Sequence, residues 1–396
     1  MPYRRFLLLL ALKIKHVKVK IQIASLLLLL SLPLTVRAQK LTLGSCTVYE
    51  GSGKTRISGT YKGEMRGGKP DGKGSVLYDN GNTYEGKFLK GKRDGYGIYT
   101  FADGEKYEGM WMQNQQHGRG TYYFSNNNKY VGLWFRDYQQ GHGIMYYYNG
   151  DKYDGEWFQD KRQGKGTYTY SSGAYYKGQW SNDQKNGRGF FDWGDGTTYD
   201  GQWVNNVRSG KGINRYADGD TYNGDWKNDI QNGRGVYKFQ NGDVYEGDYV
   251  EGERTGEGIF KYSNGDCYTG QFKDGDKCGM GTFKWKNGDT YTGMWQNDVQ
   301  NGHGKLAKST GDIFEGNFVK GKVEGEVIIH YADGSRFKGI YRNGMRNGAA
   351  IEETKDGTRF EGKYVDDVRD GKFVEKDRNG QIIKHGYYEN GKRFED

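Results

Sequence analysis

Aromatic and polar side chains alternate along this chain in a unit that repeats every 23 residues. An aromatic residue stands first in each unit, and a glycine follows two places later. No unit is longer or shorter than the others, so each is expected to contact its neighbours in the same way. The fourteen first residues are Tyr61, Tyr84, Tyr107, Tyr130, Tyr153, Tyr176, Tyr199, Tyr222, Tyr245, Tyr268, Tyr291, Phe314, Phe337 and Phe360.

Each unit contains two runs in which every second residue is aromatic, aliphatic or glycine. If the first aromatic residue is position 0, the runs occupy positions 0, +2 and +4, and then +11, +13, +15 and +17. A period of two is typical of a β-strand with one buried face, so each unit is predicted to be a β-hairpin. In one unit these residues are Tyr107, Gly109, Trp111, Gly118, Gly120, Tyr122 and Phe124.

The spacing also predicts how neighbouring strands are aligned. A three-residue loop at positions +18 to +20, with glycine last, would place Tyr99 opposite Tyr107 and so keep all aromatic residues on one face. A six-residue loop at positions +5 to +10 would place +4 opposite +11. Both alignments bring glycine opposite glycine, at +2 and +13.

The paired glycines have a physical reason in this arrangement. A tyrosine or tryptophan ring can lie across a neighbouring strand only where no Cβ obstructs it. The predicted structural glycines are Gly109, Gly118, Gly120, Gly155, Gly164, Gly166, Gly201, Gly210 and Gly212. The rings themselves either only cover these glycines or also bind a partner; they are Tyr107, Trp111, Tyr130, Trp134, Tyr153, Trp157, Tyr176, Trp180, Tyr199, Trp203, Tyr222 and Trp226.

The repeated unit resembles the MORN repeat. Tyr153-Asp154-Gly155-Glu156-Trp157, followed by Gly164-Lys165-Gly166, is close to the consensus of that family. The resemblance implies an all-β fold, in which fourteen hairpins over residues 61–382 form an elongated, single-layer, antiparallel ribbon or trough. Arrays of this family are described as scaffolding, dimerising or membrane-associating segments. Residues 39–60 are predicted to cap the first repeat, and residues 383–396 form a degenerate C-terminal cap.

Residues 1–38 are predicted to be a secretory signal peptide. A basic segment precedes the apolar run Ile21 to Val36, and Val36-Arg37-Ala38 suits cleavage after Ala38. A retained N-terminal anchor is the alternative, because the basic segment is long. Leu43-Gly44-Ser45-Cys46 also resembles a lipoprotein processing box, although Arg37 and Lys40 separate it from the apolar run.

The charge distribution and the polar residues exclude several function classes. Seven of the nine net positive charges lie in residues 1–38, which leaves +2 for the remainder and argues against nucleic-acid binding. Gly53-Lys54-Thr55 lacks the glycine that a phosphate-binding loop needs at Val48. The histidines lack metal-ligand spacing, and acidic residues such as Asp154 and Glu156 are expected to be simply solvated. We predict no catalytic residue, no metal site and no cofactor.

These features predict a non-catalytic, exported protein that binds a protein partner or itself in the cell envelope or the extracellular space. A surface for membrane lipid or glycan is the alternative. The pattern leaves open whether Cys267 and Cys278 form a disulfide or remain unpaired.

The predicted export signal can be tested by mass spectrometry of the protein recovered from its native envelope fraction. We expect the mature chain to begin near Gln39. An intact N-terminus at Met1 would indicate the anchor instead.

Overall fold

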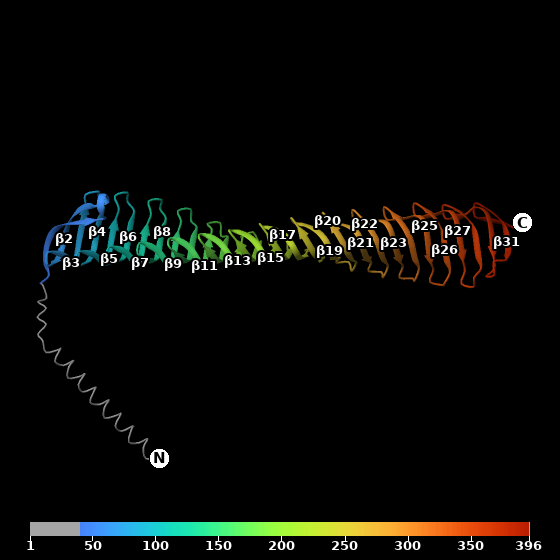
Figure 1. The fold of residues 1–396 in the computed structure, drawn as a ribbon, viewed down its shortest axis with the longest axis horizontal. Helices are drawn as coiled ribbons and strands as arrows, with labels where there is room; N and C mark the ends of the chain where they lie inside the picture. Colours follow the sequence, from blue (N-terminus) through green and yellow to red (C-terminus); the bar gives the residue numbers. More distant parts are fainter. Residues whose placement is uncertain (1–39, 396) are drawn as a thin grey trace, which may run out of the picture. The chain divides into compact units, whose positions relative to one another are not determined.

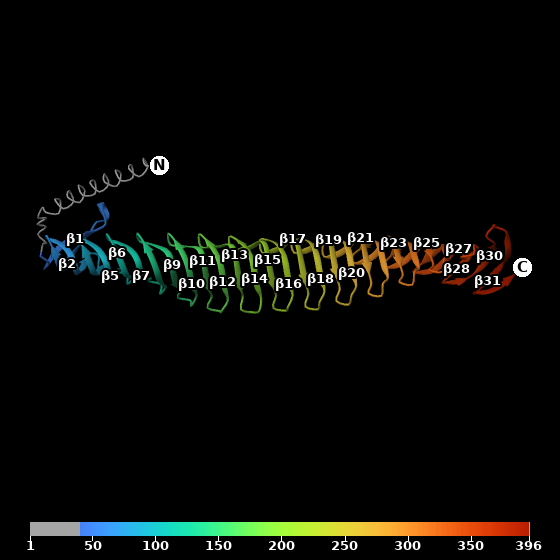
Figure 2. The same cartoon turned by 90° about the horizontal axis from the view of Figure 1, so that it is seen from below.

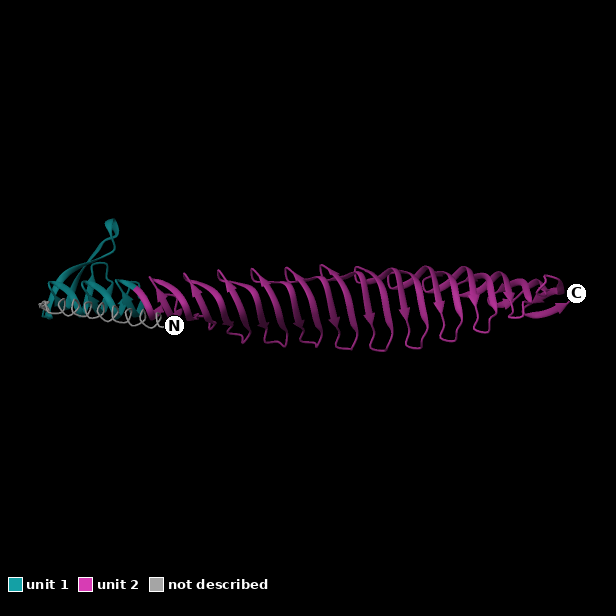
Figure 3. Ribbon diagram, turned by 60° about the horizontal axis from the view of Figure 1, so that its bottom comes forward, with its two compact units in different colours: residues 1–115 teal, residues 116–396 magenta. Residues whose placement is uncertain are grey.

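The computed structural model describes residues 40–395, which contain 32 β-strands and one short 3-10 helix. The predicted signal peptide lies outside these residues. The described chain forms two compact units, with the boundary between Gln115 and Gln116 (Figure 3). No helix among the described residues is long and apolar enough to cross a membrane.

Unit 1 contains the predicted N-terminal cap and the first repeats. Its strands are antiparallel, and each pairs with the next one along the chain. The cap segment supplies β1, which pairs with β2 from Thr42 opposite Met65 to Glu50 opposite Ile57. The elements are β1 (Thr42–Glu50), η1 (Gly53–Thr55), β2 (Ile57–Arg66), β3 (Lys69–Tyr78), β4 (Thr83–Leu89), β5 (Lys92–Thr100) and β6 (Lys106–Met112).

Unit 2 is a row of antiparallel hairpins that follow one another in chain order with a gradual twist (Figures 1 and 2). Strand β7 (Gln115–Tyr123) begins at the unit boundary. The other strands are β8 (Lys129–Phe135), β9 (Tyr138–Tyr146), β10 (Lys152–Phe158), β11 (Lys161–Thr169), β12 (Tyr175–Ser181), β13 (Gln184–Asp192), β14 (Thr198–Val204), β15 (Val207–Arg215), β16 (Thr221–Lys227), β17 (Ile230–Lys238), β18 (Val244–Val250), β19 (Glu253–Lys261), β20 (Cys267–Lys273), β21 (Asp276–Lys284), β22 (Thr290–Gln296), β23 (Val299–Ala307), β24 (Ile313–Val319), β25 (Lys322–His330), β26 (Arg336–Arg342), β27 (Met345–Glu353), β28 (Arg359–Val365), β29 (Val368–Arg369), β30 (Gly371–Lys376), β31 (Ile382–Glu389) and β32 (Lys392–Glu395).

The three-residue loop between repeats is confirmed. Strand β5 places Tyr99 opposite Tyr107 on β6, and glycine lies opposite glycine two positions further along. The loop is closed by hydrogen bonds from the Phe101 amide to the Glu105 carbonyl and from the Gly104 amide to the Phe101 carbonyl. Gly104 has φ +90°, a conformation that few other residues adopt, which explains the glycine at position +20.

The prediction of a six-residue loop within each repeat is wrong. Phe158 on β10 pairs with Lys161 on β11, so only Gln159 and Asp160 form the turn, and both have positive φ. Such a turn has a twist that matches the twist of the flanking strands, which favours it over a longer loop. Consequently Trp157 lies opposite Arg162 rather than Gly164.

Because the turn has only two residues, the strand that follows it has extra residues, and these form a β-bulge. Between the pairs Gly155–Gly166 and Trp157–Arg162, β10 has one residue and β11 has three. Gly164, in the middle of these three, has φ +66°. In the next repeats the backbone amide after this glycine donates to the side chain at +3, from Arg188 to Gln179 over 2.8 Å and from Lys211 to Gln202 over 3.3 Å. Position +3 therefore caps the bulge, whereas the sequence predicted only solvated side chains there.

The rings at position 0 cover the paired glycines, as predicted. A Cβ added to Gly201 would overlap the Tyr199 hydroxyl and lie 2.5 Å from Cα of Gly212. The same hydroxyl donates a hydrogen bond to the Gln202 carbonyl over 3.0 Å, and Tyr199 is fully buried. Because burial disfavours the phenolate, the pKa of Tyr199 rises to about 12.

The C-terminal repeats replace this arrangement with an aliphatic and aromatic core. Val327 stands opposite Gly316, and Ala350 stands opposite Gly339. The first position becomes phenylalanine, which has no hydroxyl to donate to the backbone. The side chains that pack together there are Val327, Ile329, Phe337, Tyr341, Ala350, Phe360, Tyr364, Phe373 and Tyr388.

The ring-over-glycine contact can be tested with Gly201→Val. The new side chain would force the Tyr199 ring away from Gly212, and we expect a loss of about 1–3 kcal/mol in the free energy of unfolding. Urea unfolding followed by far-ultraviolet circular dichroism measures this loss. Glu156→Gln is the control, because glutamine already stands at +3 in other repeats; equal destabilisation by both changes would contradict the assigned faces.

Candidate functional site

The sheet presents two chemically different faces. We call the side that carries positions 0, +2, +4, +9, +13, +15 and +17 the aromatic face, and the side that carries +1, +3, +12 and +14 the polar face. The bulge brings +9 onto the aromatic face, because +9 pairs with +4. Each face is a candidate binding surface, so the exposure of its side chains decides what it can contact.

The twelve rings predicted as the candidate binding face are buried. The tyrosines at position 0 are 0% exposed, and the tryptophans at +4 are 3–6% exposed. Trp157 packs edge-to-face between Tyr153 and Tyr130, at centroid distances of 5.2 and 5.3 Å. Its indole N–H donates to the Gly143 carbonyl over 3.1 Å. These rings therefore form the core of the sheet and have little surface left for a partner.

The nine predicted glycines fall into three positions of the repeat. Gly109, Gly155 and Gly201 at +2, and Gly120, Gly166 and Gly212 at +13, form pairs with a glycine of the adjacent strand. The remaining three, Gly118, Gly164 and Gly210, stand in the bulge at +11 with positive φ.

On the aromatic face of unit 2, partly accessible rings stand at position +17 in eight consecutive repeats. They are half-buried, except that Trp193 is exposed at 36%. Each lies near a ring at +15 of its own repeat or of the next one. Tyr170–Phe191 and Tyr262–Phe283 are examples of the second kind, with centroids 5.8 and 5.7 Å apart. We call this set the ring row; it consists of Phe124, Tyr147, Tyr170, Trp193, Tyr216, Phe239, Tyr262 and Trp285. The alternation showed that +17 belongs to the aromatic face, but it could not show that +17 stays accessible while 0 and +4 do not.

Cationic side chains at +9 cover the buried tryptophans on the same face. The Arg162 guanidinium lies 4.5 Å from the centre of the Trp180 ring and pairs with Asp183 over 3.1 Å. Arg208 repeats this arrangement with Trp226 and Asp229. Sequence reasoning missed position +9 because the six-residue loop placed it outside the strands.

Lys185 occupies position +9 in the repeat between those two arginines. Its ammonium lies 4.5 Å from the Trp203 ring centre and 4.6 Å from that of Phe191. The acidic position of the neighbouring repeat is Asn206, which accepts a hydrogen bond from the Lys185 backbone amide over 2.8 Å. Burial lowers the pKa of Lys185 to about 8; Asp229 opposes this change and Arg162 adds to it.

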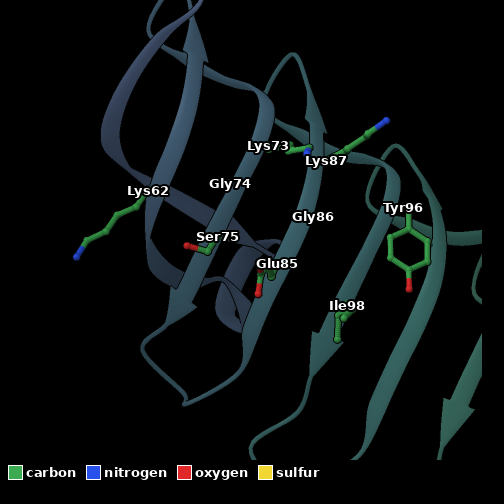
Figure 4. Close-up of a pocket in the computed structure, with 9 residues that line it drawn as sticks. All are labelled: Lys62, Lys73, Gly74, Ser75, Glu85, Gly86, Lys87, Tyr96 and Ile98. Carbon is green, nitrogen blue, oxygen red and sulfur yellow. The ribbon is translucent and has the colours of Figure 1, made fainter.

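The polar face has a shallow relief and a column of basic side chains. Grooves of about 500 and 590 Å³ lie on it in unit 1 and unit 2 respectively. Figure 4 shows the first groove, where Lys62 and Lys87 point to opposite sides rather than toward a common centre. The column at +12 in unit 2 includes Lys165, Arg188, Lys211 and Arg234, and the last three pair with carboxylates of the next repeat at 2.8–4.0 Å.

The cysteines of unit 2 are free and cannot pair within the chain. Cys267 lies opposite Lys284, whereas Cys278 lies opposite Gln271, four positions further along β20. Four residues of a strand span about 13 Å, which exceeds the reach of a disulfide. Among residues 40–395, no group of three or more histidine, cysteine, aspartate or glutamate side chains could hold a metal ion.

The family model of the MORN repeat matches twelve segments, and each starts at a first position identified above. The chain belongs to the MORN-repeat family. The matched segments are residues 61–83, 84–106, 107–129, 130–152, 153–175, 176–198, 199–221, 222–244, 245–267, 268–290, 291–313 and 337–359. Two of the fourteen predicted repeats, 314–336 and 360–382, are not matched, although their residues form strands β24, β25, β28, β29 and β30.

Other comparisons add little to this MORN-repeat chain. No curated protein sequence matches it. The SAS-4 TCP domain of Drosophila melanogaster is 15% identical over 39% of this chain and 83% of that one, with a TM-score of 0.27. A variant of the TCP10 domain of Danio rerio CPAP is 10% identical over 74% and 99%, with a TM-score of 0.12. A streptogramin B lyase is 11% identical over 75% and 94%, with a TM-score of 0.13.

The environment of Lys185 predicts a pH dependence of stability. The pKa of this lysine is about 8 in the folded chain and about 10.4 in an unfolded one. Between these values the unfolded state binds more protons, so stability should rise with pH. Lys185→Gln should remove this rise.

Urea unfolding of the original chain and of Lys185→Gln at pH 7, 8 and 9 measures the difference. We expect the stability advantage of the variant to shrink as the pH increases. A difference between the two proteins that stays constant over this range would contradict the lowered pKa. Measurements stop at pH 9 because tyrosine ionisation in the unfolded state begins near pH 10.

Proposed function

We propose that this MORN-repeat chain is a non-catalytic scaffold in the cell envelope or extracellular space, and that it holds an extended segment of a protein partner, or of a second copy, on the aromatic face of unit 2. The observation that carries the proposal is the ring row. Eight accessible rings stand at the same position of eight consecutive repeats. A surface of this kind is extended, whereas catalytic sites are usually concave and few.

The spacing of the ring row suits an extended chain. Each repeat contributes two strands about 4.8 Å apart, so successive rings lie about 10 Å apart along the row. An extended segment advances about 3.3 Å per residue, and roughly every third residue would then reach a ring. Aromatic side chains are effective anchors because they bury a large area while losing little conformational freedom.

Many such contacts, each weak, can give a strong total affinity. Binding should also cost little side-chain conformational entropy, because contacts with neighbouring rings at +15 already restrict these half-buried rings. Binding should therefore decline gradually as rings are removed rather than disappear with one of them.

A second function, binding to an anionic membrane or glycan, is favoured by the basic column at +12 on the polar face. Arg188 and Arg234 have side chains exposed at 78% and 71%. However, their carboxylate partners in the next repeat offset part of this charge, and the net charge outside residues 1–38 is only +2. We therefore place protein binding first.

The two functions are separated by a pair of triple variants. Trp193, Phe239 and Trp285 changed to serine remove three rings of the ring row. Phe190, Ile213 and Ile259 changed to serine remove three half-buried apolar side chains at +14 on the polar face and serve as the matched control. We expect only the ring-row variant to lose retention of protein from envelope extract, by about tenfold or more.

Both variants must first show circular dichroism spectra like that of the original chain. Equal loss in the two, or loss in the polar-face variant alone, would contradict the proposal. Strong, salt-sensitive co-sedimentation with anionic liposomes that the ring-row variant retains would place the membrane function first.

A further inference from the structure

Cations at position +9 are regularly accompanied by a carboxylate. In unit 2, Arg162 pairs with Asp183, Arg208 with Asp229 and Lys277 with Asp298, at 3.1, 3.1 and 3.3 Å. The acid comes from position +7 of the next repeat, so the pair joins neighbouring hairpins. A cation that is partly withdrawn from water over aromatic rings gains from such a partner, because burial removes its solvation.

Lys185 departs from this rule. Its +7 neighbour is Asn206, which supplies an amide oxygen to the backbone but no charge. No carboxylate in residues 40–395 forms an ion pair with Lys185. Its ammonium instead faces the rings of Tyr176, Phe191 and Trp203 at 4.5–5.6 Å. Phe191 in turn contacts Trp193, the most exposed ring of the ring row, with centroids 4.4 Å apart.

In unit 1, a +9 cation that also lacks an aspartate at +7 has a carboxylate partner from another segment. Arg93 also stands at +9, and its neighbour at +7 is Asn114 rather than aspartate. There a carboxylate arrives from outside the repeated array: Glu50, at the end of β1, pairs with Arg93 over 2.6 Å. Glu50 also accepts a hydrogen bond from Tyr99 at position +15 over 2.6 Å. The Arg93 side chain is only 7% exposed.

We infer that Lys185 is a receptor for an aspartate or glutamate side chain of the protein partner, which approaches over Phe191 as Glu50 approaches over Tyr99. This inference rests on the proposed protein-binding function and specifies the chemistry at one position of its site. Arg162 and Arg208 stand at +9 of the repeats on either side of Lys185, and each is paired with its own aspartate. A second cation at +9, Arg254, also has no carboxylate partner in the described chain, and it lies three repeats further along.

Burial lowers the pKa of Lys185 to about 8, and Asp229, which pairs with Arg208 instead, opposes this change only in part. A carboxylate that binds there would restore the missing charge partner.

The test uses the segment that occupies the equivalent position in unit 1. A fluorescently labelled peptide with the sequence of residues 44–53, carrying Cys46→Ser, is titrated with the full chain, alongside the same peptide carrying Glu50→Gln. Anisotropy gives the two dissociation constants. We expect the glutamate peptide to bind about tenfold more tightly than the glutamine peptide, the effect of one charge-assisted contact.

Three variants locate this preference. Lys185→Gln should reduce the difference between the two peptides to what Arg254 alone supports. Asn206→Asp should also reduce it, because the new carboxylate would pair with Lys185 within the chain. Asn206→Asp restores the residue type of Asp183 and Asp229 and is expected to fold. Lys277→Gln is the matched control, since that lysine already has Asp298, and it should leave the preference unchanged.

A chain that does not distinguish the two peptides, or a preference that is undiminished in Lys185→Gln, would overturn the inference. Either result would leave the proposed function standing if the ring-row variant still loses its protein partner. The converse result is a glutamate preference that depends on Lys185 together with normal protein retention by the ring-row variant. It would confirm the carboxylate site and would contradict the role proposed for the ring row.

Discussion

The tyrosine ring that lies across two facing glycines is the contact on which the array depends. A ring at position 0 covers Gly–Gly pairs such as Gly201 and Gly212, and a Cβ on either glycine would overlap it. The hydroxyl then satisfies a carbonyl three residues along the same strand, as Tyr199 does for Gln202. Because the ring fills the space that two side chains would otherwise occupy, a single sheet acquires a core without a second layer.

The tryptophans connect these covered pairs into a continuous core. Tryptophans at +4 pack edge-to-face against the tyrosine of their own repeat and that of the preceding one, as Trp157 does with Tyr153 and Tyr130. The cation at +9 then covers the tryptophan of the next repeat, and its acid comes from that repeat too. Each repeat is therefore stabilised chiefly by contacts with its neighbours, as expected for a linear array.

The same packing determines what is left for function. Rings at 0 and +4 are buried in the core, whereas rings at +17 of the same face stay partly accessible. Lys185 lacks the carboxylate partner that Arg162 and Arg208 have, because asparagine replaces aspartate in the neighbouring turn. A change of one residue in a repeated unit thus creates a local difference in charge, and such differences are how a uniform array could select a partner and fix its register.

The amino-acid sequence by itself determined the repeat length, the two strands per repeat, the alignment across the three-residue loop and the reason for the paired glycines. These follow from local alternation and from the φ that Gly104 requires, and neither needs knowledge of distant contacts. Only the tertiary structure decided that the other connection is a two-residue turn with a bulge, which moves Arg162 and Lys185 onto the aromatic face. It also decided which rings stay accessible and that Cys267 and Cys278 lie too far apart to pair. These properties depend on how the strand bends at Gly164 and on side chains from the next repeat, about twenty residues away, so no local pattern contains them.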